Sequence, residues 1–527
     1  MTSFLYLVII NIVILCSHAY VTYDNYKVYR VYLDSPGKVN SFSKIHELIP
    51  KLDVWNENVA DKSIDVMVPP EDQYEFTDSL SSYKIQQEVF ISNVAELIDK
   101  YSEASYSNRL GGEFNWTTYQ TYEQIVGWLE SLAQTYPDNV TTVVLGKSHY
   151  GVDIVGAKLV LNPNATRVAI IEGGIHAREW ISPATVTYIL NSFLTSSLRR
   201  VRNAAESMIW YFVPSINPDG YNRTFHEDRL HRKNVQVVNG TNCSYFVGGN
   251  GIGTDLNRNF NYTWMEAGGA SSRPCSSSYA GPEPFSAPET RAMKALVEQV
   301  SDSLDLYICF HSFSQLVLFP YGHTTDPIDN YYEQYAIARM AADELEAYNG
   351  TKYVVGNIAE AIYVSTGSSL DWVKGTYGTR LTYGLELRDQ GQYGFLLPPD
   401  QIIDTGEETL NAVVVLVEQL FRLDLLTFTR PSGQGSFTQF LPHTLFLSVF
   451  IIKFYTIGRM AADAIESNSG RKYIVGNSAE AIYISTGGSD DWVKGTFGTR
   501  LVYTYEVRDT GTYGFLLPPD QIIDTAE

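Results

Sequence analysis

Apolar and polar positions alternate with two different spacings in the chain after residue 116. Residues 122–136 and 288–300 carry apolar side chains at helical spacing, with polar side chains between them. Short apolar runs, residues 208–213 and 304–310, lie among these stretches and have the length of buried strands. This alternation predicts an α/β fold with a mixed, mostly parallel twisted sheet and helices on both of its faces.

A second and smaller pattern precedes this sheet. Residues 26–32 and 64–68 alternate as strands do, and residues 89–101 have helical spacing. We therefore expect a small α+β domain over residues 20–109.

The first 19 residues form a separate apolar segment. Its centre, residues 5–16, is followed by Ser17-His18-Ala19, a small-x-small pattern suited to signal peptidase, although a charged beginning is missing. A buried helix or a membrane anchor is the alternative, but the apolar stretch is shorter than the ~20 residues that span a bilayer. We interpret residues 1–19 as a signal peptide and expect a secreted, extracellular protein without a membrane span.

Composition agrees with a folded and soluble protein. The 527 residues are 44% hydrophobic and 13% aromatic, which supplies a large core and excludes a disordered chain. The formal net charge of -21 argues against nucleic-acid binding, which requires a basic face.

The chain also contains a partial duplication. Residues 335–407 recur as residues 455–527 at an offset of 120, with 52 of 73 aligned positions identical. Residues 425–454, between the copies, are expected to be a spacer. We expect no independent catalysis from the second copy, since it lacks counterparts of His176, Glu179, Arg232, Arg258 and His311.

Three metal-binding residue types follow apolar runs. His176 and Glu179 come after residues 168–171, and His311 comes after residues 304–310. In doubly wound sheets the loops beyond the strand ends form the ligand crevice, so these side chains are expected to lie there. Two imidazoles and one carboxylate leave a fourth zinc position for water, which indicates a catalytic rather than a structural zinc site.

Several separated motifs give this short pattern its context. Together they resemble the pancreatic-type carboxypeptidase A and B family of zinc metallocarboxypeptidases over residues 20–423. The motifs are Asn217-Pro218-Asp219-Gly220, Arg229-Leu230-His231-Arg232-Lys233, Asp255-Leu256-Asn257-Arg258-Asn259-Phe260, His311-Ser312-Phe313-Ser314-Gln315 and Glu386-Leu387-Arg388-Asp389.

The resemblance implies a zymogen with one Zn²⁺ in a catalytic domain, residues 110–424. Residues 20–109 would be the activation propeptide, and Arg109 would be the point at which a trypsin-like protease releases it. An ordinary N-terminal domain joined by a loop is the alternative, because linkers and protease sites look alike. The expected substrates are the C-termini of peptides and proteins, and the expected state is a monomer.

The resemblance also assigns roles to individual residues. His176, Glu179 and His311 would bind zinc, Glu386 would be the general base, and Arg232 would stabilise the charge that develops in the transition state. Asn257 and Arg258 would bind the substrate's terminal carboxylate. Tyr363 would close over the substrate, and Arg178 would be a secondary substrate contact. Asp255 would orient a zinc-binding histidine.

Specificity is expected to depend on Leu370, the position that separates the A type from the B type in the family. A buried leucine offers no countercharge to lysine or arginine, so it favours aromatic and large aliphatic C-terminal residues. A B-type preference for Lys or Arg is the alternative. A peptide-binding homologue without catalysis and an inhibitor-like precursor are further alternatives.

We interpret the second copy as part of a neighbouring gene copy joined to this one. A further hypothesis is that it competes with residues 335–407 for a place in the sheet. In the second case Asp490 would replace Leu370 and invite basic side chains.

Four cysteines are present. Cys16 belongs to the signal peptide, and Cys243 and Cys275 flank the Asn257-Arg258 loop, where an extracellular disulfide is predicted. Cys309 is predicted to be a buried core thiol without a chemical role.

Overall fold

The computed structural model of the protein describes residues 20–58, 62–106, 114–238, 241–243, 247–427 and 465. This described part divides into two compact units, Met1–Asp326 with Ala342–Val414 and Pro327–Ala341 with Val415–Glu527. Both β-sheets lie in the first unit. The described part of the second unit contains the first half of α9 (Tyr331–Asn349) and the end of α12 (Ile402–Thr427).

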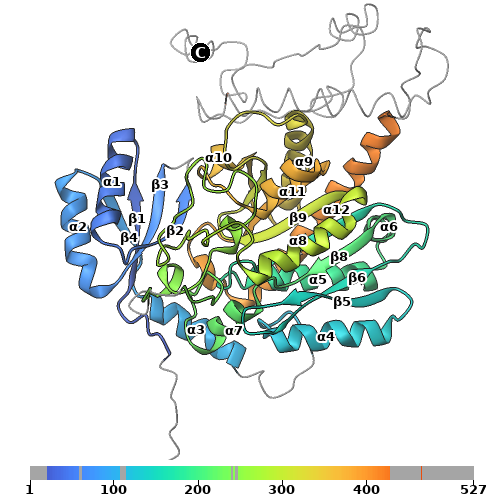
Figure 1. Cartoon of the computed structure of the whole chain (residues 1–527), viewed down its shortest axis with the longest axis horizontal. Coiled ribbons are helices and arrows are strands. Elements are labelled where there is room, and N and C mark those ends of the chain that lie inside the picture. The colour runs from blue at the N-terminus through green and yellow to red at the C-terminus, as the bar shows by residue number, and fades with distance from the viewer. Residues whose placement is uncertain are drawn as a thin grey trace, which may run out of the picture. The chain divides into compact units, whose positions relative to one another are not determined.

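A small antiparallel sheet forms the N-terminal domain, in the order β2-β3-β1-β4. Its strands and helices are β1 Lys27–Tyr32, α1 Pro36–Leu48, β2 Asp53–Asn58, β3 Ser63–Val68, the short η1 Pro70–Asp72, α2 Gln73–Ser82, β4 Gln86–Ile91 and α3 Val94–Tyr106. Figure 1 shows α1 and α2 on one side of this sheet. The small α+β domain predicted for this region is confirmed.

The two faces of this small sheet pack against different partners. Tyr29 and Val31 of β1 point toward α1 and α2, where they join a buried cluster with Phe42 and Phe76. Because side chains alternate along a strand, Val28 points to the opposite face. There it shares a second cluster with Trp55, Leu230, Phe313 and Phe395, of which the last three follow the N-terminal domain in the chain.

One boundary in this domain was predicted wrongly. Residues 89–91 belong to strand β4, in which Val89 pairs with Tyr29 of β1, and helix α3 starts only at Val94. The Asn93 side chain accepts a hydrogen bond from the backbone N–H of Ala95, at 3.2 Å, and so begins the helix. Apolar spacing alone did not reveal this change, because Val89 and Phe90 suit a strand equally well.

The main sheet has eight strands in the order β11-β10-β12-β9-β7-β8-β6-β5. Its strands are β5 Val140–Lys147, β6 Asp153–Leu159, β7 Val168–Glu172, β8 Ile209–Val213, β9 Leu304–Ser312, β10 Leu316–Phe319, β11 Val354–Asn357 and β12 Leu381–Leu387. The central strands β12, β9, β7 and β8 run parallel, and antiparallel pairs occur toward both edges. The predicted mixed sheet is confirmed.

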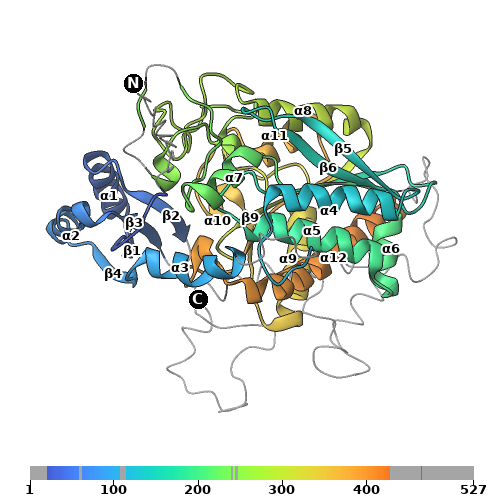
Figure 2. The same ribbon diagram turned by 90° about the horizontal axis from the view of Figure 1, so that it is seen from below.

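Helices cover both faces of the main sheet. They are α4 Tyr122–Thr135, α5 Ile181–Thr195, α6 Arg199–Ser207, α7 Pro218–His226, α8 Pro288–Val300, the short α10 Ile358–Ala361 and α11 Ser369–Tyr377, with single turns η3 Gly248–Asn250, η4 Leu256–Arg258, η5 Ser301–Ser303, η6 Gly394–Leu396 and η7 Pro399–Gln401. Figure 2 shows α8 and α11 on one side and α4 and α5 on the other. Among the described residues, no helix is both long and apolar enough to cross a bilayer.

A disulfide joins Cys243 and Cys275, which are 32 residues apart. Cys309 is a free, buried thiol. Both observations agree with the sequence-based expectations for these cysteines.

Replacing Cys243 and Cys275 together by serine is expected to lower the free energy of unfolding by about 2–4 kcal/mol, because closing a loop of this length restricts the unfolded chain. Denaturant titration under oxidising conditions measures the loss. A reductant should destabilise the parent protein by a similar amount and leave the double variant unchanged. Equal stability of the two proteins under oxidising conditions would contradict the expectation.

Candidate active site

The predicted zinc ligands come from two neighbouring strands. His176 and Glu179 lie in the loop that leaves β7, and His311 is the penultimate residue of β9. Strands β7 and β9 are parallel, with Ile171 paired with Ile308. Their carboxyl ends therefore meet at the same edge of the sheet, which is where ligands bind in such folds.

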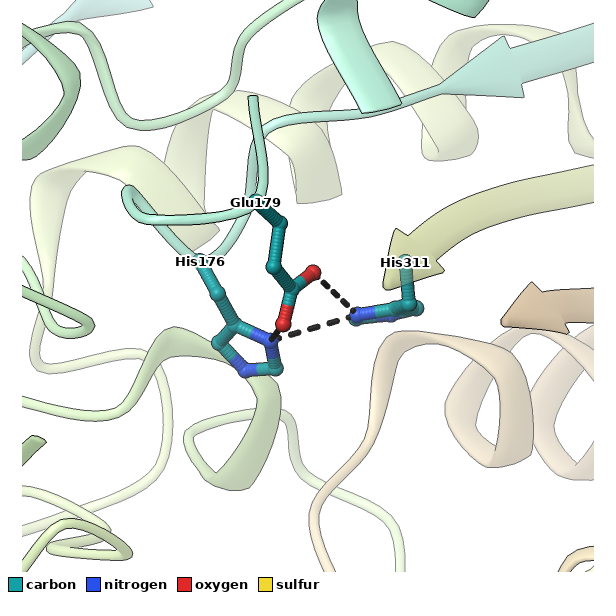
Figure 3. Close-up of side chains that lie close together, drawn as sticks. All are labelled: His176, Glu179 and His311. Carbon is teal, nitrogen blue, oxygen red and sulfur yellow. Dashed lines mark hydrogen bonds and ion pairs between the residues drawn. The ribbon is translucent and has the colours of Figure 1, made fainter. Parts of the chain in front are cut away.

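The donor atoms of these residues converge on one point, as Figure 3 shows. The Nδ1 atom of His176 lies 2.7 Å from Glu179 Oε1 and 3.2 Å from the Nδ1 atom of His311, which lies 3.1 Å from Glu179 Oε2. Bonds of about 2.0–2.1 Å to a tetrahedral zinc ion separate neighbouring ligand atoms by about 3.3 Å. All three side chains are buried. Their donor set and spacing therefore fit a zinc ion.

Burial and mutual attraction shift the pKa values of these three side chains. Burial lowers the pKa of His176, which favours the neutral imidazole that a metal requires. Burial opposes ionisation of Glu179, but the two facing imidazoles outweigh it and lower the pKa of this carboxyl. Burial likewise opposes protonation of His311, and Glu179 outweighs it and raises the pKa of this ring. A cation between these groups is thus electrostatically favoured.

Asp255 supports this cluster from outside. Its Oδ1 atom lies 3.2 Å from Nε2 of His176, and its Oδ2 atom accepts a hydrogen bond from Arg232 at 3.0 Å. Asp255 is fully buried. The contact with Nε2 turns the Nδ1 atom of His176 toward Glu179 and His311, as a carboxylate beside a metal-binding histidine commonly does.

Glu386 enters the site from the next strand, β12, where it pairs with His311 in parallel register. Burial, with a smaller contribution from Glu179, raises the pKa of Glu386 to about 8, while His311 and two arginines oppose the shift. A carboxyl with such a pKa can exchange a proton near neutral pH. The nearby Arg388, two residues further along the chain, pairs with Glu408 and not with Glu386 in the part of the chain that the structure describes.

The predicted carboxylate grip is held in place by its neighbours. Arg258 donates to the backbone oxygen of Gly269 at 2.8 Å and to the hydroxyl of Tyr363 at 3.1 Å. Asn257 accepts a hydrogen bond from the backbone N–H of Ser369 at 3.0 Å. Tyr363 lies in a loop.

One cavity brings most of the predicted residues together. It is lined by His176, Glu179, Arg232, Asn257, Arg258, His311, Tyr363, Leu370 and Glu386. Leu370 shares an apolar part of this lining with Cys309, Leu318, Ile358, Ile362 and Gly384. Arg178 and Asp255 are not part of the lining, since Arg178 is paired with Asp53 and Asp255 lies behind His176.

Sequence reasoning missed several residues of the cavity wall, among them three from the N-terminal domain. Trp55, Asn56 and Glu57 of β2 line the same cavity as the predicted zinc ligands. Nothing in their spacing distinguishes them from other residues of a half-buried strand. Cys309, predicted to be only a core thiol, is also part of the cavity wall.

Comparison with known proteins agrees with the geometry. The family model described as "Zinc carboxypeptidase" matches residues 125–412 and 450–527, and the model described as "Carboxypeptidase activation peptide" matches residues 29–101. The chain belongs to the zinc carboxypeptidase family. The second range matched by the zinc carboxypeptidase model, residues 450–527, includes the duplicated segment, residues 455–527. Apart from residue 465, this segment lies outside the described residues.

Relatives of this carboxypeptidase include proteins named carboxypeptidase A and proteins named carboxypeptidase B. Zinc carboxypeptidase A 1 of Anopheles gambiae is 41% identical over 402 residues, which cover 75% of this chain and 90% of the relative. Carboxypeptidase B of Astacus astacus is 42% identical over 303 residues, which cover 57% and 97%. Similar identity to an A-named and a B-named relative does not separate the two specificities.

Solved structures share the fold. Carboxypeptidase A from Helicoverpa armigera has a TM-score of 0.68 and 27% identity, with 76% of this chain and 98% of that chain covered. Thrombin activatable fibrinolysis inhibitor has a TM-score of 0.67 and 29% identity, with 75% and 99% covered.

Changing Asp255 to Asn is expected to weaken zinc binding about 10- to 100-fold, because the contact that orients His176 loses its negative charge. Competition with a chelator of known zinc affinity measures the change. Asp305→Asn is a suitable control, since Asp305 pairs with Arg167 at the start of β7, away from the zinc edge. Unchanged zinc affinity in Asp255→Asn would rule out this role.

Proposed function

We propose that this zinc carboxypeptidase is a secreted zymogen that removes C-terminal residues from peptides and proteins, with preference for aromatic and large aliphatic side chains. The observation that carries the proposal is the meeting of a buried metal-binding cluster, Glu386 and Arg258 in one cavity. A proton acceptor and a carboxylate grip beside a metal site are the parts that an exopeptidase requires.

The residues of the cavity would have different roles in the reaction. When bound by His176, Glu179 and His311, zinc would activate a water molecule and polarise the scissile carbonyl. Glu386 would accept the proton of the attacking water on a carboxylate oxygen and deliver it to the leaving amine nitrogen.

Three further side chains would act on the substrate itself. Arg258 and Asn257 would hold the terminal carboxylate and so select the last peptide bond. Arg232 would stabilise the oxygen that becomes negative, and its hydrogen bonds to Asp255 keep its guanidinium in place.

The specificity proposal depends on the apolar part of the cavity. Leu370 is buried there beside Cys309 and Gly384, and the side-chain atoms recorded around Gly384 belong to Cys309, Leu370 and Leu318. An aromatic side chain would bury its surface in such a pocket, whereas an ammonium or guanidinium group would lose its hydration without a partner.

The domain assignment remains a proposal. Residues 20–109 would be the activation segment and residues 110–424 the catalytic domain. Inhibition would follow from the position of Trp55, Asn56 and Glu57 in the cavity. The signal peptide, Arg109, most of the spacer at residues 425–454, and the second copy at 455–527 apart from residue 465 lie outside the described residues.

Trypsin treatment of the full chain is expected to produce hydrolysis of C-terminal residues that a zinc chelator abolishes and added zinc restores. One zinc ion per chain should be found by metal analysis. Glu386→Gln should retain the zinc and lose about 10²- to 10⁴-fold in kcat, the usual contribution of a general base. Zinc-free protein, or hydrolysis that survives the chelator, would refute the proposed function.

Changing Leu370 to Asp is expected to reverse the preference between paired peptides that end in Phe and in Lys. The ratio of their kcat/KM values should move at least about tenfold toward Lys, since a buried carboxylate would pair with the ammonium group. Leu370→Asn is the matched control, because asparagine has the shape of aspartate without its charge. A Lys preference in the unaltered enzyme would instead favour the B type.

A further inference from the structure

Asn349 lies at the exposed end of helix α9. Gly350 and Thr351 follow it, and the three residues form an Asn-x-Thr motif, the acceptor sequence for N-linked glycans. Asn349 and Gly350 are both exposed, and Gly350 has a φ of +74°, the left-handed conformation that ends many helices. The side chain of Asn349 is therefore accessible from solvent.

The chain leads from this helix end into β11, which lies at an edge of the main sheet. β11 pairs with β10 on one side, and it is the last strand of the sheet on the other side within the described residues. An edge strand presents unpaired backbone groups to which another chain can add, and native proteins protect such edges with charged side chains or cover them.

The residues between Asn349 and β11 are fixed to the domain. The hydroxyl of Thr351 accepts a hydrogen bond from Arg388 at 2.9 Å. Tyr353 is buried and donates to Glu408 at 3.1 Å, and Arg388 pairs with the same carboxylate. A group attached to Asn349 would therefore stay beside the start of β11.

Apolar side chains are exposed around Asn349. Tyr348 is 46% exposed, Val354 at the start of β11 is 50% exposed, and Ile403 is 43% exposed. Ile403 belongs to this surface because its neighbour Asp404 accepts a hydrogen bond from the Asn349 amide at 3.4 Å. All these residues belong to the first compact unit. Apolar side chains beside an open strand edge favour association with a second chain.

Other Asn-x-Thr motifs of the chain are placed differently. The Asn139 amide donates to a backbone oxygen at 3.0 Å, and Thr224, which completes the motif of Asn222 in helix α7, is fully buried. Asn164 is exposed in the turn between β6 and β7, but both of these strands are interior strands of the sheet. Asn349 combines exposure with a position beside an edge strand.

We propose that Asn349 carries an N-linked glycan that covers the edge at β11 and keeps copies of the enzyme from associating through it. The inference rests on the proposed function, because such glycans are added on the secretory route. A glycan is bulky and solubilising, whereas the four residues of β11 span only about 10 Å. One glycan at the start of this strand is large enough to shield it.

The modification is a transfer of an oligosaccharide from a lipid diphosphate. The amide nitrogen of Asn349 gives up one proton and forms a bond to the anomeric carbon of the first sugar. The bond from that carbon to the diphosphate oxygen breaks, and the lipid diphosphate leaves with its electron pair. The amide nitrogen keeps its second proton, so its hydrogen bond to Asp404 can persist.

Peptide mapping of the full chain, secreted from a eukaryotic host, tests the site. A glycosidase that removes N-linked glycans converts the asparagine that carried one to aspartate, and this mark is expected at position 349. Asn349→Gln should lose the mark and one glycan's mass, whereas Thr351→Ser preserves an acceptor motif and should retain both. An unmodified Asn349 in the secreted protein would overturn the proposal.

Self-association, measured by light scattering after size-exclusion chromatography, tests the covering role. Asn349→Gln is expected to leave the monomer at a concentration roughly fivefold lower than the parent, as two or three exposed cross-strand pairs would produce. Asn164→Gln loses a motif away from the sheet edges and should behave as the parent does. Adding Val354→Lys to Asn349→Gln should restore the monomer, since a charge on an edge strand opposes pairing.

Enzymatic removal of glycans from the folded protein gives the same comparison if Asn349→Gln is not secreted. The deglycosylated parent should associate, and deglycosylated Val354→Lys should remain a monomer. A parent that stays monomeric without its glycans, over the range in which the comparison is made, would overturn the covering role.

Hydrolysis by the same samples separates this inference from the proposed function. After trypsin treatment, monomeric Asn349→Gln should cleave peptides that end in Phe with the kcat/KM of the parent, because Asn349 is not among the residues of the cavity wall. Chelator-sensitive hydrolysis together with an unmodified Asn349 would refute the glycan and leave the carboxypeptidase standing. A protein that is neither secreted nor able to hydrolyse peptides would refute both proposals.

Discussion

The parallel pairing of β7, β9 and β12 is the constraint on which the site depends. The register that pairs Glu386 with His311, and Ile171 with Ile308, brings three strand ends to one edge of the sheet. The loop after β7 and the ends of β9 and β12 therefore place their functional side chains close together. Below this edge, the buried carboxyl of Glu172 accepts hydrogen bonds from Tyr307 of β9 at 2.8 Å and Ser369 of α11 at 2.9 Å, and so links the elements that carry the site. A shift of one residue in this register would turn Glu386 to the opposite face of the sheet.

Two carboxyl groups in this cavity acquire opposite properties from their surroundings. Glu179 faces two imidazoles, and its pKa falls despite burial. Glu386 is less enclosed than Glu179, and no ion pair is recorded for it within the described part of the chain; desolvation raises its pKa to about 8. One carboxyl thus suits a permanent ligand and the other suits proton transfer, a division that environment alone produces in many enzymes.

Sequence patterns predicted those features that are encoded locally. Helix α8 and strand β8 follow from their apolar spacing, and His176 with Glu179 stand close enough in the chain to be recognised together. The roles expected of Arg258 and Glu386 came instead from resemblance, because their neighbours in space are distant in sequence. The pair of Asp53 with Arg178 spans 125 residues and could not be predicted, since an acidic residue at a strand end usually faces water.

The activation segment holds the catalytic domain by two kinds of contact with different consequences. Trp55 of the segment packs on Phe395, with ring centres 5.3 Å apart, and shares a buried apolar cluster with Leu230 and Phe313, so this contact removes apolar surface from water. The pair of Asp53 with Arg178 contributes less to net affinity, because two charges lose their hydration when it forms. Its effect is positional, since only one placement of β2 satisfies both groups.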